Sequence, residues 1–149
     1  MTRLKYLIPA VLAVCSLPVF AQKNPCDLVT QSEASALLGS AVDKKTSPTS
    51  CIYKVKGSTV ALHVRIEKNK GTAASVTKAN LGKSGAVVKD EPSLGAGSYS
   101  AVWPSSDRFY MVKGDQMLRI DYADPSGGKI PDGLLEKLRA AAKTALGRL

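Results

Sequence analysis

Apolar and polar residues alternate along two stretches in the middle of the chain, and this period of two predicts β-strands. The stretches are 50–56 and 59–67, and they flank Gly57-Ser58, a Gly-X pair typical of a type II′ hairpin turn. Pairing the strands across this turn gathers their apolar side chains on one face: Cys51, Tyr53, Val55, Val60, Leu62 and Val64. A one-residue slip would turn these side chains to the opposite face, so the agreement of the two alternations predicts a hairpin with one buried face.

A second hairpin is predicted around Gly114-Asp115, between strands at 108–113 and 116–122. Its register pairs apolar residues on one face: Met111 with Leu118 and Phe109 with Ile120. It pairs larger polar side chains on the other face: Tyr110 with Arg119 and Arg108 with Asp121. The two hairpins therefore repeat one design, with an apolar and a polar face in each.

Weaker patterns predict the remaining strands and loops. Residues 98–103 alternate, with Tyr99, Ala101 and Trp103 on one side, and 86–89 forms a shorter strand. Residues 43–50 (DKKTSPTS) show no alternation and contain a proline, so this segment is predicted to be a polar loop.

Helical spacing of apolar residues predicts three helices. The first covers 31–38, because Thr30 and Glu33 form a capping box before it and Gly39 ends it. A weaker helix is predicted over 69–81. A third runs from Asp132, its expected N-cap, to the C-terminus, with a wide apolar face: Leu134, Leu135, Leu138, Ala141, Ala142, Ala145, Leu146 and Leu149.

Hairpins combined with helices, without the pattern of a right-handed crossover, predict an α+β fold. We expect an antiparallel sheet built from hairpins, with two or three helices packed on one face. We expect residues 22–149 to form this single domain.

Residues 1–21 have the pattern of a secretory signal peptide. Arg3 and Lys5 precede an apolar stretch over 7–20, and cleavage is predicted after Ala21. No transmembrane segment would then remain in the mature chain, which would be periplasmic or secreted. A lipid-anchored protein is the alternative, because Leu12-Ala13-Val14-Cys15 resembles a lipobox.

Cleavage after Ala21 would remove Cys15 and leave two cysteines, Cys26 and Cys51. An even number of cysteines in an exported chain predicts a disulfide, which would clamp the first helix onto the buried face of the first hairpin. We expect no metal site, since the single histidine, His63, cannot complete a zinc site with these cysteines. No cofactor is expected.

The chain is basic, with a net charge of +9. Removing residues 1–21 takes away two of the 21 basic residues and none of the 12 acidic ones, which leaves +7. A basic exported protein suggests anionic partners such as lipid headgroups, cell-wall polymers or an acidic protein. Surface lysines that only maintain solubility are the simpler interpretation.

The stretches PCDLVTQSEASALLG and CIY resemble a broad group of small bacterial secreted or lipid-anchored domains of unknown function. The later stretches SLGAGSY and YMVKGDQMLRI resemble the same group. The matching positions are Cys26, Leu28, Thr30, Glu33, Leu38, Gly39, Cys51 and Tyr53. The resemblance implies a fold class with a cap, a helix stop and a disulfide, rather than an activity.

The sequence contains no nucleophile elbow and no glycine-rich phosphate loop before a helix. His63 is predicted on the outer face of the first hairpin, without a carboxylate nearby in the sequence. We therefore predict a non-enzymatic binding protein, with an uncharacterised enzyme as the second alternative.

The expected partner is a protein of the cell envelope, as for an inhibitor, an immunity-type protein or a complex subunit. The predicted binding residues lie on the polar face of the second hairpin, whose residue types are common at interfaces: Arg108, Tyr110, Val112, Met117 and Arg119. A further strand or helix covering this face is the competing interpretation. The alternative function is binding of an anionic polymer or lipid through a basic patch of Lys54, Lys56 and Arg65. Nucleic acid is disfavoured, because export separates the protein from it.

Overall fold

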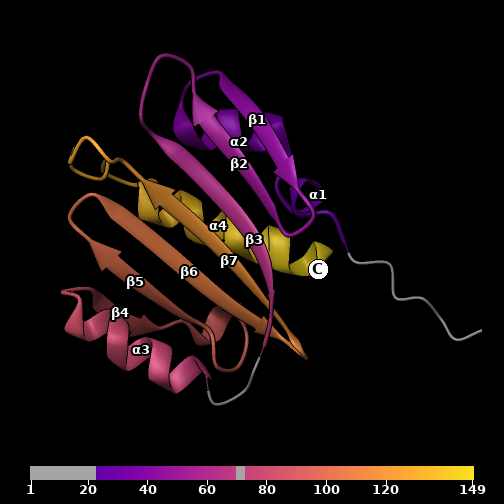
Figure 1. Ribbon diagram of the computed structural model, residues 1–149, viewed down its shortest axis with the longest axis vertical. Coiled ribbons are helices and arrows are strands. Elements are labelled where there is room, and N and C mark those ends of the chain that lie inside the picture. The colour runs from indigo at the N-terminus through magenta and orange to yellow at the C-terminus, as the bar shows by residue number, and fades with distance from the viewer. Residues whose placement is uncertain (1–22, 70–72) are drawn as a thin grey trace, which may run out of the picture.

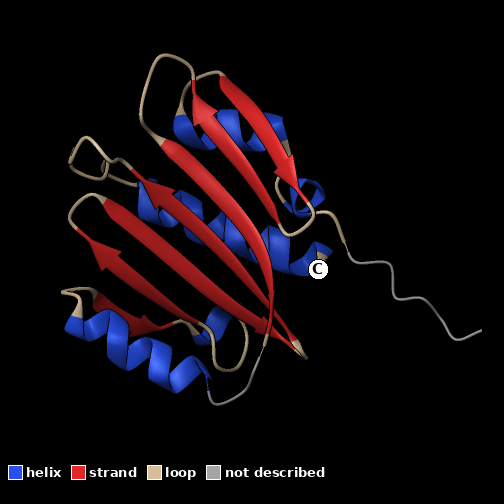
Figure 2. Cartoon of the chain, in the orientation of Figure 1, coloured by secondary structure: helices blue, strands red, loops and turns tan. Residues whose placement is uncertain are grey.

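The computed structural model describes residues 23–69 and 73–149. Within them, seven strands form one antiparallel sheet in the order β1-β2-β3-β7-β6-β5-β4 (Figure 1). The strands are β1 (Val42–Ser47), β2 (Ser50–Val55), β3 (Ala61–Lys68), β4 (Val87–Asp90), β5 (Tyr99–Trp103), β6 (Ser106–Lys113) and β7 (Gln116–Ala123). The helices are α1 (Pro25–Leu28), α2 (Gln31–Leu38), α3 (Ala73–Lys83) and α4 (Leu134–Arg148), with a 3-10 turn, η1, at Pro92–Leu94 (Figure 2). The predicted signal peptide lies outside the described residues.

Both predicted hairpins are confirmed, in the predicted register. Cys51 pairs with Val64 in β2–β3, and Met111 pairs with Leu118 in β6–β7. Strand β3 also pairs with β7, which joins the two hairpins at the centre of the sheet. The apolar faces of the two hairpins therefore merge into one, and so do their polar faces.

The prediction of a loop over 43–50 is wrong, because Val42–Ser47 forms the edge strand β1. Only Val42 is buried in this strand, and its other side chains are exposed. An edge strand that is exposed on both faces has no alternation of apolar and polar residues, so the sequence does not reveal it. Its lysines are typical of edge strands that avoid pairing with another chain. The turn between β1 and β2 is therefore shorter than the predicted loop and consists of Pro48 and Thr49.

Three helices cover one face of the sheet, which we call the core face. Helices α1 and α2 pack on β1, β2 and β3, and α4 packs on β6 and β7. Their buried side chains form one apolar cluster with alternate residues of those strands, including Leu62, Met111 and Ile120 at 0% exposure. This cluster is the main source of stability.

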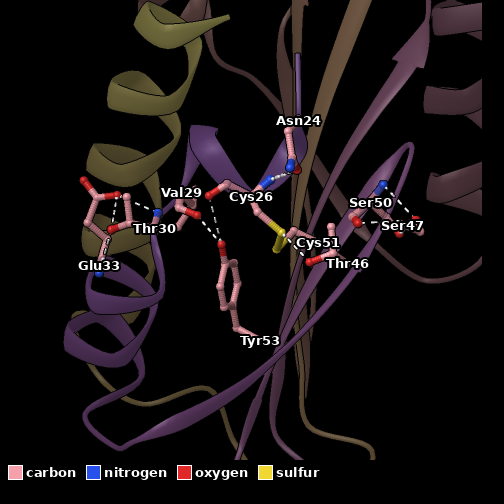
Figure 3. The surroundings of a disulfide bond; sticks show 10 residues. All are labelled: Asn24, Cys26, Val29, Thr30, Glu33, Thr46, Ser47, Ser50, Cys51 and Tyr53. Atoms are coloured by element: carbon pink, nitrogen blue, oxygen red, sulfur yellow. Dashed lines mark hydrogen bonds between the residues drawn. A yellow bond between two sulfur atoms is a disulfide. The ribbon is translucent and has the colours of Figure 1, made fainter. Parts of the chain in front are cut away.

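The disulfide Cys26–Cys51 is present and joins α1 to β2 on the core face (Figure 3). The buried Tyr53 hydroxyl lies beside it and donates hydrogen bonds to the backbone carbonyls of Cys26 and Val29. Burial raises the pKa of Tyr53 to about 12. The bridge and this tyrosine together hold the first helical segment against the sheet.

Helix α3 lies on the opposite face, so the prediction of two or three helices packed on one face is not confirmed for the helix expected over 69–81. Its residue Leu81 packs against Tyr99, Ala101 and Tyr110 in a second, smaller cluster. The reason lies in β5, whose Tyr99, Ala101 and Trp103 point away from the core face while Ser100 and Val102 point toward it. Residues 70–72, part of the predicted 69–81 helix, lie outside the described residues.

The capping box of α2 is confirmed, with Thr30 and Glu33 bonded reciprocally and Gly39 in the left-handed conformation at φ 68°. The prediction that Asp132 caps the C-terminal helix is wrong. Helix α4 begins at Leu134 with Gly133 as its N-cap, and no side chain caps it. Asp132 lies one residue too early for that role.

Candidate protein interface on the open face of the sheet

Helix α3 covers only the β4–β5–β6 end of its face. No helix among residues 23–69 and 73–149 covers the outward side chains of β2, β3 and β7 (Figure 1). We call these side chains, with their neighbours on β6, the open face: Ile52, Lys54, His63, Arg65, Glu67, Arg108, Met117, Arg119 and Asp121. It contains most of the residues that the sequence proposed for binding.

The strand order brings the two alternative binding patches onto this one surface. One cross-strand row is Ile52, His63, Asp121 and Arg108. The next row is Ser50, Arg65, Arg119 and Tyr110. The sequence treated Arg65 and Arg119 as members of competing sites, and the β3–β7 pairing places them directly opposite each other.

Tyr110, predicted as an exposed binding residue, is only 3% exposed. Its ring stacks on Tyr99 with centroids 4.6 Å apart, beneath α3. Met117 packs partly against the same cluster. The competing interpretation was that a further strand or helix covers this face. It is correct only at the end of the face that contains Tyr110, which α3 covers.

Arg119 is held by two carboxylates. Its Nε donates to Asp121 at 3.1 Å, and its Nη1 lies 3.1 Å from a carboxylate oxygen of Glu67. Only 17% of its side chain is exposed. Its charge is therefore largely balanced within the sheet.

Arg65 differs from Arg119 although it lies directly across the strand pair. It is half-buried, and its guanidinium makes no hydrogen bond or ion pair with any residue that the structure describes. Its Nε is buried and has no acceptor. Arg119 lies directly opposite and has the same charge, and like charges at opposed positions destabilise a sheet. Asp121 attracts Arg65 electrostatically but forms no ion pair with it.

Arg108 lies at the border of the open face and α3. Its guanidinium carbon is 4.9 Å from the centre of the Trp103 ring, in a cation–π contact. Its Nε is 3.9 Å from Asp121, and 40% of its side chain is exposed. Arg108 therefore offers a pre-positioned guanidinium to a partner.

Asp121, which is 7% exposed, is the buried acid of the open face. Burial raises its pKa, and the neighbouring arginines oppose that effect. His63 lies across the strand pair from it, and burial is the main cause that lowers the His63 pKa. The sequence missed this juxtaposition, because it depends on the non-local pairing of β3 with β7.

The remaining proposed residues are Lys54 and Lys56. Lys54 is exposed on the open face. Lys56 lies in the turn after β2 and forms an exposed ion pair with Asp43 at 3.6 Å. Such a pair contributes little to stability.

The core face contains a second group of charges, away from the open face. Arg139 of α4 donates two hydrogen bonds of 3.1 Å to Glu91, which also accepts one from Ser100. Asp107 is fully buried, and both of its carboxylate oxygens lack a hydrogen-bond partner. Burial raises the pKa of Asp107 to about 7, and the nearby Glu91 carboxylate adds to the shift.

Two shallow cavities of about 420 and 460 Å³ lie over the start of α4, on either side of Pro131 and Asp132. Their linings are mainly aliphatic and proline side chains, such as Leu37, Val60 and Ile130. Among the described residues, no group of three or more His, Cys, Asp or Glu side chains could hold a metal ion. The open face is therefore the richest collection of partly exposed functional groups.

No protein-family model matches the chain, and no curated protein or solved structure matches it either.

Proposed function

We propose that the protein is an exported, non-enzymatic binding protein that engages a protein partner in the cell envelope through the open face. The observation that carries this proposal is the uncovered centre of the sheet, where Arg65, Arg108 and Arg119 lie on three neighbouring strands. Interfaces are enriched in arginine and aromatic residues, and Trp103 stands beside Arg108.

The placement of the arginines favours a protein partner over an anionic polymer or lipid. The guanidiniums of Arg108 and Arg119 are partly buried and held by neighbours, which suits specific, directional contacts. The basic patch supplies only one lysine to this face, because Lys54 lies on it and Lys56 lies in the turn after β2, where it pairs with Asp43. A polymer-binding surface would be expected to collect exposed lysines on one face.

Export is supported by the disulfide, because such bonds persist in oxidising compartments. No helix in the described ranges is long and apolar enough to cross a membrane. The signal peptide expected at 1–21 would direct the chain to export, and lipid anchoring at Cys15 is the alternative.

The proposal is tested by capture from the native envelope with two matched variants of the tagged full chain. His63→Trp places a bulky neutral side chain in the middle of the open face. Lys44→Trp places the same side chain on the neighbouring edge strand, facing the other side. We expect a defined protein that binds the wild type and Lys44→Trp and is lost with His63→Trp, while all three chains keep the same melting temperature.

Equal capture by both variants would refute the proposed surface. Sedimentation with anionic vesicles or cell-wall polymer, lost at high salt in both variants, would support the polymer alternative instead.

A further inference from the structure

Apart from Lys45 and Lys54 on β1 and β2, the centre of the open face has one positive charge more than its own residues balance. Three guanidiniums, Arg65, Arg108 and Arg119, face two carboxylates, Glu67 and Asp121. His63 adds no full charge at neutral pH, because its pKa is lowered from 6.5. The centre of the open face therefore has one unbalanced positive charge.

That excess is localised on Arg65. Arg119 is bonded to both carboxylates and Arg108 approaches Asp121, whereas Arg65 has no ion pair among the described residues. Its Nε is buried without an acceptor, although a buried donor without a partner costs free energy. The terminal Nη donors of this half-buried side chain are not among the buried atoms, so they are the donors that the acceptor of a partner can reach.

We propose that Arg65 binds a carboxylate of the partner protein, from an Asp or Glu side chain or a C-terminus. This inference rests on the proposed function and names the chemistry of the same surface. A guanidinium matches the two oxygens of a carboxylate in a planar, bidentate arrangement. Ile52, half-buried on the adjacent strand, offers an apolar contact next to it.

The local charges select a carboxylate over a phosphate. A single negative charge neutralises the excess on Arg65. A doubly charged phosphate would remain anionic beside Glu67 and Asp121, which are fixed within the same two strands. The acidic residues of the open face thus weaken the binding of phosphorylated ligands and of lipid headgroups.

The first test observes the Arg65 side chain directly in the disulfide-bonded mature protein. The Nε–Hε resonances of the arginines are followed by NMR while hexaglutamate, hexaglutamine or inorganic phosphate is added at constant ionic strength. We expect a saturable shift of the Arg65 resonance with hexaglutamate, no shift with hexaglutamine, and at least tenfold weaker binding of phosphate.

Two variants make this test specific. Arg65→Gln should weaken hexaglutamate binding at least tenfold, and Lys44→Gln, which removes the same charge from the opposite side of the sheet, should weaken it less than threefold. An unshifted Arg65 resonance, equal losses in both variants, or tighter binding of phosphate than of hexaglutamate would each overturn the carboxylate assignment.

Envelope capture separates this inference from the proposed function. If His63→Trp abolishes capture and Arg65→Gln does not, the surface is correct and the carboxylate assignment is wrong. If neither variant loses the partner, the surface itself is wrong. We expect both variants to lose it, with capture by Arg65→Gln reduced at least tenfold.

Discussion

The two faces of the sheet are built from the same strands but differ in almost every physical respect. On the core face, Leu62 and Val64 are fully buried under α1 and its neighbours. On the open face, the residues between and beside them, His63 and Arg65, remain half-exposed and charged or polar. Alternation along a strand thus separates stabilising from binding residues by a single position.

The difference locates stability and function in different side chains. The core face carries the disulfide, the main apolar cluster and the buried Tyr53. The open face carries charged groups instead: the ion pairs of Arg119 and the guanidinium of Arg65, whose Nε has no acceptor. Substitutions on the core face should therefore change the free energy of unfolding, and substitutions on the open face should change binding.

The largest effect is expected from breaking the disulfide on the core face. Closing a loop between residues 25 positions apart stabilises a protein by about 3.5 kcal/mol in the chain-entropy model. Cys51→Ser should therefore lower the free energy of unfolding by about 2–5 kcal/mol, measured by urea denaturation. An unchanged midpoint, or two free thiols on the denatured, unreduced wild type, would contradict this role.

The next effect should come from Asp107, the unpartnered acid on the core face. Its pKa is raised from 3.8 to about 7, so the folded state binds this proton more tightly than the unfolded chain. Stability is then full below pH 3.8 and falls as the pH rises to about 7.

Asp107→Asn should remove this pH-dependent loss and stabilise the protein by roughly 2 kcal/mol or more at pH 8.5, with little gain at pH 4. Urea denaturation at the two pH values measures the difference. An equal effect at both pH values would mean that ionisation of Asp107 is not its cause.

Leu81→Ala tests whether α3 is a separate covering on the other face. Leu81 is 9% exposed and is the buried anchor of the helix on Tyr99 and Tyr110. The truncation should cost about 2 kcal/mol, and much of it should appear as faster hydrogen exchange in α3 alone. Uniformly faster exchange in both clusters would show that the two faces unfold as one unit.

The smallest effect is expected from Glu33, which joins α2 to Arg148 at the end of α4. The Arg148 hydrogen bonds lower the pKa of Glu33 from 4.5 to about 2. The pair is partly exposed, so Glu33→Gln should cost only about 1 kcal/mol at pH 7. Because the folded pKa is depressed, this contribution is present above pH 4.5 and is lost as the pH falls through about 2. A cost that persists unchanged at pH 2 would contradict this assignment.

The sequence predicted the parts of the molecule that local rules determine. Both hairpin registers and the α2 cap follow from turn glycines, alternation and a capping box within a few residues. The edge strand β1 was missed, because its exposed side chains give no periodic signal. The face of the sheet on which α3 packs was also missed, since the alternation of β5 does not say on which face of the sheet its apolar residues lie.

The candidate site depends on what local rules cannot show. Arg65, Arg108 and Arg119 were identified as separate possibilities, but only the β3–β7 pairing places Arg65 opposite Arg119. The same pairing brings Asp121 to His63. Tyr110 was misplaced because the alternation of a strand does not say which of its faces another element will cover.

The most direct test of the central claim is photo-crosslinking in cells that export the chain. One variant carries p-benzoylphenylalanine at Ile52 on the open face, and a second carries it at Lys44, on the neighbouring strand but facing the opposite side. We expect an adduct of one defined mass from position 52 and none from position 44. An adduct from position 44 alone, or identical adducts from both, would contradict it.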